Sequence, residues 1–289
     1  MQESVQYKIF KVFNTIILLV IVFCTLYPFL NVIAQSFSSE AYINAGKVNL
    51  LPKGFNIETY KTVAEDKMFW INYKNTVVYT VVGTVISMFL TTIFAYALSK
   101  KRLVGRRFLT LFAVFTMFFN GGLIPNYVLI NSLGFDNTMW AIVIPGAISI
   151  YNMLIMKSFF ENMPEELEEA ASIDGLNTYG ILLKIILPLS KAVLATMVLF
   201  YAVGHWNSWF PAFLYLDQKE LFPVTIYLRN LIAGVTGGTS AGATSADNLT
   251  QISSNIKSVT MVLTILPILT VYPFVQKYFV SGVMLGSVK

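Results

Sequence analysis

Six apolar segments, each long enough to cross a lipid bilayer, constrain this chain more than any other feature. A bilayer-spanning helix needs about 20 mainly apolar residues, and the segments that meet this requirement are residues 12–34, 75–98, 108–130, 138–156, 192–216 and 258–276. Only 12% of the residues are charged, against roughly 25% in soluble globular domains. The sequence therefore predicts an all-α, polytopic membrane protein in which residues 1–289 form one transmembrane domain.

The two short connections between these segments predict the orientation of the chain. Connection 131–137 has no Lys or Arg, whereas connection 99–107 holds Lys100, Lys101, Arg102, Arg106 and Arg107. Because Lys and Arg accumulate on the cytoplasmic side of a membrane, we expect residues 99–107, residues 157–191 and both termini in the cytoplasm. Residues 35–74 and 217–257 are then expected outside. This role in topology is enough to account for the basic residues.

Several function classes are disfavoured by what the segments contain. His205 is the one ionisable residue well inside a predicted span, whereas ion-coupled carriers usually hold charged residues there. The P-loop pattern for ATP is missing, because Gly46-Lys47 is followed by Val48 and position 41 is Ala. A single histidine cannot supply a metal-binding cluster, and no catalytic constellation is apparent. The basic residues adjoin apolar spans rather than forming a stripe for nucleic acid.

The connection at 157–191 has the features of a short capped helix. Asn162 is the expected cap, Pro164 suits the first turn, and Glu165 stands three residues after the cap. The spacing i, i+3, i+4, i+7 places four residues on one face: Leu167, Ala170, Ala171 and Asp174. Gly175 permits the left-handed turn that ends a helix. Two interpretations remain open here, a helix that docks on a partner and an acidic connector that is solvated on all sides.

This connection also resembles a known signature. Its motifs are Glu169-Ala170-Ala171, Asp174-Gly175 and Ile186-Leu187-Pro188. They resemble the EAA motif of binding-protein-dependent ABC importer permeases, and the form of residues 164–175 is similar to the maltose-type carbohydrate branch. Leu176 stands where Ala is common in the family, which is a conservative departure. Further segments resemble Gram-positive permeases for complex oligosaccharides: residues 120–125, 206–209 and 276–283.

The resemblance implies a permease subunit of an ATP-driven importer in the bacterial cell membrane, translocating a sugar oligomer. It implies a coupling helix that docks on an ATPase subunit through Glu169, Ala170, Ala171, Asp174 and Gly175. The implied partners are a second homologous permease, two ATP-binding subunits that carry ATP and Mg²⁺, and an extracellular solute-binding lipoprotein. No cofactor is expected in this chain. The alternatives are an ABC permease for a non-sugar solute and an ion-coupled secondary carrier.

Further expectations concern a sugar path, an outer connection and the tail. A sugar path is one interpretation of Asn120, Gly121, Gly122, His205, Trp206, Asn207 and Trp209. Its rivals are a kink near the outer surface at the glycines, an aromatic belt or helix packing at the tryptophans, and a structural hydrogen bond at His205. Gly234, Gly237 and Gly238 are expected in a flexible outer connection that touches the binding protein. The tail after Gln276 is expected to leave the last span and to contact the ATPase subunits, or else to pack back on the bundle.

Overall fold

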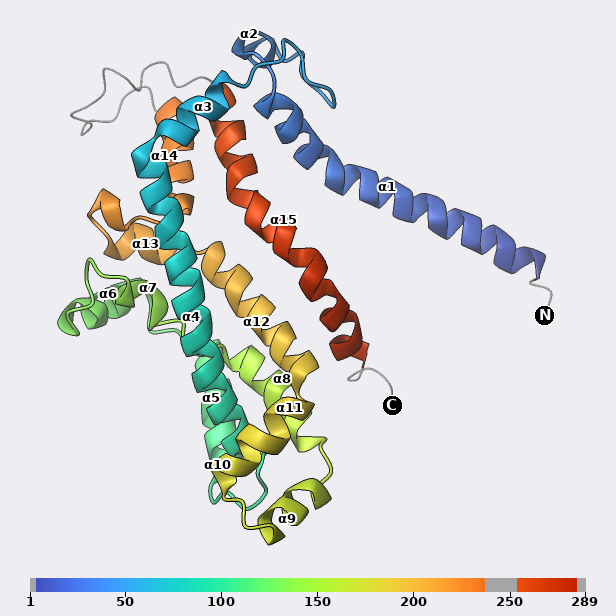
Figure 1. Ribbon diagram of the computed structural model, residues 1–289, viewed down its shortest axis with the longest axis vertical. Helices are drawn as coiled ribbons and strands as arrows, with labels where there is room; N and C mark the ends of the chain where they lie inside the picture. The colour runs from blue at the N-terminus through green and yellow to red at the C-terminus, as the bar shows by residue number, and fades with distance from the viewer. Residues whose placement is uncertain (1–3, 237–253, 285–289) are drawn as a thin grey trace. The chain divides into compact units, whose positions relative to one another are not determined.

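The computed structural model describes residues 4–236 and 254–284, and this part of the chain is helical without β-strands (Figure 1). The α-helices, in chain order, are α1 (Val5–Ser36), α2 (Glu40–Asn44), α3 (Glu58–Glu65), α4 (Lys67–Ser99), α5 (Arg106–Phe118), α6 (Leu123–Ser132), α7 (Trp140–Val143), α8 (Ile150–Glu161), α9 (Glu166–Ile173), α10 (Thr178–Ile181), α11 (Leu187–Leu189), α12 (Lys191–Trp206), α13 (Phe210–Tyr215), α14 (Val224–Thr236) and α15 (Ser254–Met284). A π-helical segment η1 (Leu182–Ile186) joins α10 to α11, and a 3₁₀ turn η2 (Lys219–Leu221) precedes α14.

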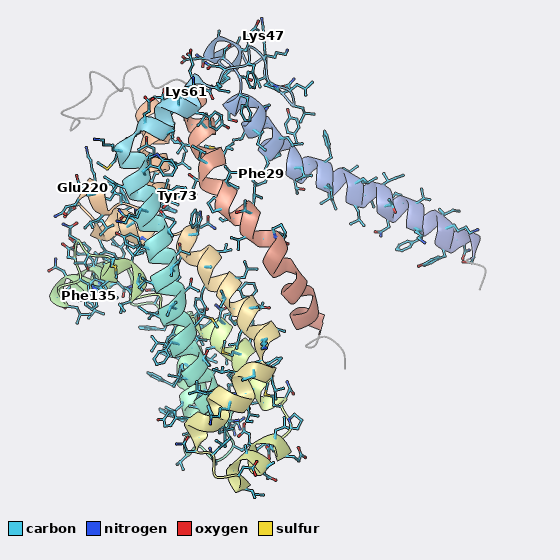
Figure 2. The ribbon with its side chains drawn as sticks, in the orientation of Figure 1. Phe29, Lys47, Lys61, Tyr73, Phe135 and Glu220 are labelled. Atoms are coloured by element: carbon cyan, nitrogen blue, oxygen red, sulfur yellow. The ribbon has the colours of Figure 1, made fainter. Side chains whose placement is uncertain are left out.

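The chain divides into two compact units. The first comprises Met1–Phe69 and Leu228–Leu266. Polar contacts tie the segment after α1 within this unit: Tyr60 donates to Ser36 Oγ at 2.8 Å, and Asn255 donates to the carbonyl of buried Ser38 at 2.8 Å. The apolar side chains of α1, including Phe29, are exposed (Figure 2). An apolar surface of this length needs lipid or another subunit to cover it.

The second unit comprises Trp70–Tyr227 and Pro267–Lys289 and contains the main core. One cluster of buried side chains joins the end of α4 to α8, η1 and α12, with Leu98, Met153 and Ile186 almost fully buried. A smaller cluster packs Tyr79 of α4 against Ala212 of α13. These contacts hold together helices that are distant in the sequence, and they frame the site described below.

The predicted series of six continuous spans is wrong in detail. Within residues 4–236 and 254–284, three helices are long and apolar enough to cross a membrane by themselves: Gln6–Ser36 within α1, α4, and Asn255–Pro273 within α15. The predicted span 108–130 is broken into α5 and α6, which meet at 113°. Span 138–156 is split into α7 and α8 around Pro145-Gly146, and span 192–216 is interrupted at residues 207–209. Two breaks coincide with helix-weakening Gly or Pro.

The predicted connections hold more helix than expected. Helix α4 begins at Lys67 rather than near residue 75, and α14 occupies part of the predicted flexible segment 217–257. The last helix continues to Met284, beyond the apolar span Asn255–Pro273 that it contains. The π-helical turn lies just before Pro188. A proline ring clashes with the carbonyl four residues earlier in a regular helix, and the wider turn relieves that clash.

Candidate functional site

A cavity of about 570 Å³ opens in the second unit, where three interrupted helical segments meet. Residues between helices contribute to its lining from all three breaks: Asn120 and Gly122 between α5 and α6, Pro145, Gly146 and Ser149 between α7 and α8, and Ser208 between α12 and α13. Irregular backbone at membrane depth is tolerated only where it is buried in protein or lines a cavity. The coincidence of breaks and cavity therefore marks this region as the candidate site.

The break between α5 and α6 is built by a local hydrogen-bond pattern. Gly122 has a φ of +94°, a backbone conformation that other L-residues rarely adopt. Its N–H donates to Asn120 Oδ1 at 3.0 Å, and Asn126 Nδ2 approaches the same oxygen at 3.4 Å. Helix α6 thus starts at the cavity with its first turn lining it through Gly122, Leu123 and Asn126.

Polar groups converge on this cavity. Asn152 of α8 is 94% buried and lines the cavity. Tyr201 of α12 is bound on two sides: its hydroxyl lies 2.6 Å from Thr91 Oγ1 of α4 and accepts from Ser149 N–H at 3.0 Å. Among the described residues, the lining contains no Lys, Arg, Asp or Glu. The cavity wall is therefore mostly apolar, with neutral polar groups set into it.

His205 takes part in both the lining and the packing of this site. Its Nε2 lies 3.2 Å from Ser87 Oγ of α4, and its ring lies over Gly83 of the same helix. A Cβ atom at Gly83 would come within 2.8 Å of the ring. The structural hydrogen bond expected of His205 is confirmed, and the residue also lines the cavity.

The structure sorts the predicted sugar-path residues into two groups. Asn120, Gly122 and His205 line the cavity, whereas Gly121, Asn207 and Trp209 do not. Trp206 is buried elsewhere, with its ring edge-on to Tyr73 of α4. The two tryptophans lie on different segments, because α12 ends at Trp206 and Trp209 packs against Phe210 and Phe213 after the interruption.

Sequence reasoning missed several lining residues, chiefly Asn126, Asn152, Tyr201 and Ser208. These side chains are neutral, whereas charged residues are the usual mark of a functional site within a membrane span. Asn152 and Asn126 still carried a signal, since an amide inside an apolar segment must find a partner or a cavity.

The acidic connection forms helix α9, but it starts later than predicted. Asn162 caps the end of α8 instead, and α9 begins at Glu166. Its end agrees with the prediction. Gly175 has a φ of +82°, its N–H donates to Ser172 O, and Leu176 N–H donates to Ala171 O. This is the Schellman pattern, which satisfies the last carbonyls of a helix.

The four residues expected on one docking face of α9 do not share one environment. Ala171 is 5% exposed and packs into the main core cluster of its own chain, so its assignment to a docking face is wrong. Leu167, Glu169, Ala170 and Asp174 are exposed. The surface of α9 left open to another protein is therefore formed by those residues and not by Ala171.

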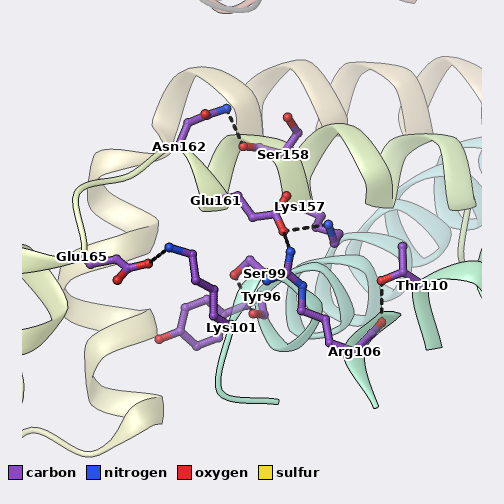
Figure 3. Close-up of polar contacts among 10 residues, drawn as sticks. All are labelled: Tyr96, Ser99, Lys101, Arg106, Thr110, Lys157, Ser158, Glu161, Asn162 and Glu165. Atoms are coloured by element: carbon purple, nitrogen blue, oxygen red, sulfur yellow. Dashed lines mark hydrogen bonds and ion pairs between the residues drawn. The ribbon is translucent and has the colours of Figure 1, made fainter. Parts of the chain in front are cut away.

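The basic connection and the acidic connection contact each other through ion pairs (Figure 3). Lys100 pairs with Glu168, and Arg106 Nη2 and Lys157 Nζ lie 2.6 and 2.8 Å from Glu161 Oε1. The exposed pair of Lys101 and Glu165 lies 2.6 Å apart, and the hydrogen bond from Lys101 lowers the pKa of the Glu165 carboxyl. The expectation that the basic residues serve topology alone is wrong. The interpretation of residues 157–191 as an acidic connector that is solvated on all sides is wrong as well.

The predicted contact residues for a binding protein fall mostly outside the description. Gly234 lies in α14 rather than in a flexible segment, which corrects part of that expectation. Gly237 and Gly238 lie outside the described residues.

Comparisons with known proteins agree with this architecture. Residues 68–284 match the family described as "Binding-protein-dependent transport system inner membrane component". The chain is 40% identical over 265 residues to the polygalacturonan/rhamnogalacturonan transport system permease protein YtcP of Bacillus subtilis, covering 91% of this chain and 92% of that protein. It is 40% identical over 282 residues to protein LplC of the same organism, covering 98% and 95%.

A solved structure extends the likeness to three dimensions. The crystal structure of a bacterial ABC transporter involved in the import of the acidic polysaccharide alginate contains a chain that superposes with a TM-score of 0.87 at 36% identity, covering 96% of this chain and 99% of that one. The matched family region includes the interrupted helices, the cavity and α9. The chain therefore belongs to the family of inner-membrane components of binding-protein-dependent transport systems, and it is an ABC transporter permease subunit rather than an enzyme.

Proposed function

We propose that this chain forms one half of the path by which an oligosaccharide crosses the bacterial membrane in an ATP-driven importer. The cavity at the three helix breaks is the observation that carries the proposal, because amide, hydroxyl and aromatic side chains line it together. Such groups bind sugar hydroxyls and ring faces. A second permease subunit completes the path, two ATP-binding subunits supply energy, and an extracellular lipoprotein delivers the sugar.

We further propose that the sugar carries uronate groups. Two of the similar proteins are named for transport of acidic polysaccharides, polygalacturonan/rhamnogalacturonan in one case and alginate in the other. In this chain, the first turn of the ten-residue helix α6 lines the cavity without a side-chain cap. Backbone N–H groups at a helix start favour anions, and the buried side-chain amide of Asn152 supplies a further donor in the same cavity.

A neutral oligosaccharide is the second candidate. It is favoured by the lack of Lys and Arg in the cavity lining. Amides and hydroxyls can form hydrogen bonds to both acidic and neutral sugars. Transport measurements with one sugar of each class therefore have to distinguish the two candidates.

The orientation follows the charge contrast between the two short connections. We propose that residues 99–107 and α9 face the cytoplasm with both termini, and that α9 docks on an ATP-binding subunit through its exposed surface. The five basic residues of 99–107, against none in 131–137, support this orientation.

Transport by the complete complex tests the proposal. The importer with its lipoprotein is reconstituted in vesicles with ATP inside, and uptake of trigalacturonate and of arabinotriose is compared. Uptake of trigalacturonate with ATP consumption supports the uronate assignment. Uptake of arabinotriose alone supports the neutral candidate, and uptake of neither, in a complex that hydrolyses ATP, argues against an oligosaccharide substrate.

A further inference from the structure

Ion pairs connect α9 to the end of α4, and α8 to the start of α5. We name this cluster the charged clasp and define it by Lys100, Arg106, Lys157, Glu161 and Glu168. Lys100 directly follows the last residue of α4, and Arg106 is the first residue of α5. The clasp therefore joins α8 and α9 to the ends of α4 and α5.

The central pair of the clasp is shielded from water. The Lys100 side chain is 15% exposed and that of Glu168 is 20% exposed, and the Lys100 ammonium lies 4.3 Å from the centre of the Tyr96 ring. Charges in such surroundings interact more strongly than exposed ones. The neighbouring pair of Lys101 and Glu165 is 79% and 66% exposed, so that water and salt weaken it.

Apolar packing and an ion pair both hold α9 to the end of α4. Helix α9 packs on α10 and η1, and Ala171 shares the main core cluster with Tyr96 and Leu98 of α4. Beside this packing, charged residues line an open hollow of about 680 Å³ toward the connection 100–106. The pair of Lys100 and Glu168 is the shielded polar contact between α9 and the residue that follows α4.

The middle of α4 and the far end of α5 lie next to residues that line the cavity. Gly83 and Ser87 of α4 contact His205, which lines it, and α5 ends next to Asn120, which also lines it. A displacement of α9 can thus pass through the clasp into helices that shape the cavity wall.

We propose that Lys100 and Glu168 are positioning residues that make α9 move together with the end of α4, so that ATP-driven displacement of α9 changes the cavity. This inference rests on the proposed function, since it assigns α9 to the ATPase contact. Glu168 then holds α9 to its own chain, whereas Glu169 is exposed for contact with the ATP-binding subunit.

The test compares Lys100→Gln and Glu168→Gln with Lys101→Gln, which removes the same charge from the adjacent exposed pair. Two quantities are measured in the assembled complex, trigalacturonate taken up per ATP hydrolysed, and the mobility of a spin label at Ile173→Cys in a Cys24→Ser background. Ile173 lies at the end of α9 and is 87% exposed. We expect the clasp variants to lower the transport ratio by roughly fivefold or more, the lower end of typical coupling effects, and to increase label mobility.

The control Lys101→Gln is expected to behave as the wild type in both measurements. The charge-swapped pair Lys100→Glu/Glu168→Lys should restore the ratio and the label mobility, and it decides the matter if a single variant does not assemble. Unchanged ratio and mobility in the clasp variants, or a charge-swapped complex as defective as the single ones, would overturn the proposal. Should wild-type complex fail to take up trigalacturonate, the proposed substrate is wrong, and label mobility alone still tests the clasp.

Discussion

The imidazole ring of His205 lies directly against Gly83, so that a methyl group at Gly83 would come within 2.8 Å of ring atoms Cε1 and Nε2. This contact joins α12 to α4 beside the cavity. Only glycine leaves room for the ring while Ser87, one turn along, keeps its hydrogen-bond distance of 3.2 Å.

Gly83→Ala is therefore expected to displace the ring and to lower the free energy of unfolding by about 1–3 kcal/mol, as overpacking usually does. Gly204→Ala is the matched control, because nothing lies within 4 Å of a Cβ at that helical glycine. Thermal unfolding of both purified variants in detergent checks the prediction. Equal midpoints would show that the ring has room to move.

Asn152→Ala should weaken uptake, because the substrate loses a buried hydrogen-bonding group. A hydrogen bond to a charged group contributes about 1.5–3 kcal/mol, which corresponds to roughly 10–100-fold. Asn152→Asp should impair trigalacturonate uptake further through like-charge repulsion. Asn162→Ala, at the exposed end of the same helix, is the control. Full transport by both Asn152 variants would remove this residue from the path.

Gly175→Val is expected to weaken stimulation of ATP hydrolysis by the loaded binding protein. The left-handed backbone at this position costs about 1–2 kcal/mol for residues other than glycine. Gly175→Asn should be milder, since asparagine tolerates this conformation better. Open space surrounds the position, so any effect reflects the end of α9 and not a clash. Identical ATPase stimulation in the two variants would contradict this explanation.

Labelling of single cysteines tests the orientation. Val104 is 93% exposed in the basic connection, and Ser132 is exposed at the end of α6. In a Cys24→Ser background, an impermeant maleimide should label Ser132→Cys in intact cells, and Val104→Cys only after the cells are opened. Labelling of both sites in intact cells would refute the predicted topology.

Local chemistry explains which features were predictable from sequence. The turn at Gly175 is predictable because glycine permits backbone conformations that other residues avoid, and the glycines at 121 and 122 indicate a kink without fixing its angle. The burial of Ala171 was not foreseen, since helical spacing says which residues share a face but not what covers it. Lys100 and Glu168 lie 68 positions apart, and such a pairing depends on the tertiary packing of α8 to α11.

The interruption of helices at residues 119–122, 144–149 and 207–209 also bears on how substrate range can change over time. These short segments lie outside the regular helices, yet each contributes to the cavity lining. An exchange of a few residues there alters the surface offered to a solute while the packing of α4, α8 and α12 stays as it is. Diversification among relatives should therefore concentrate at the breaks, with the helical framework inherited unchanged.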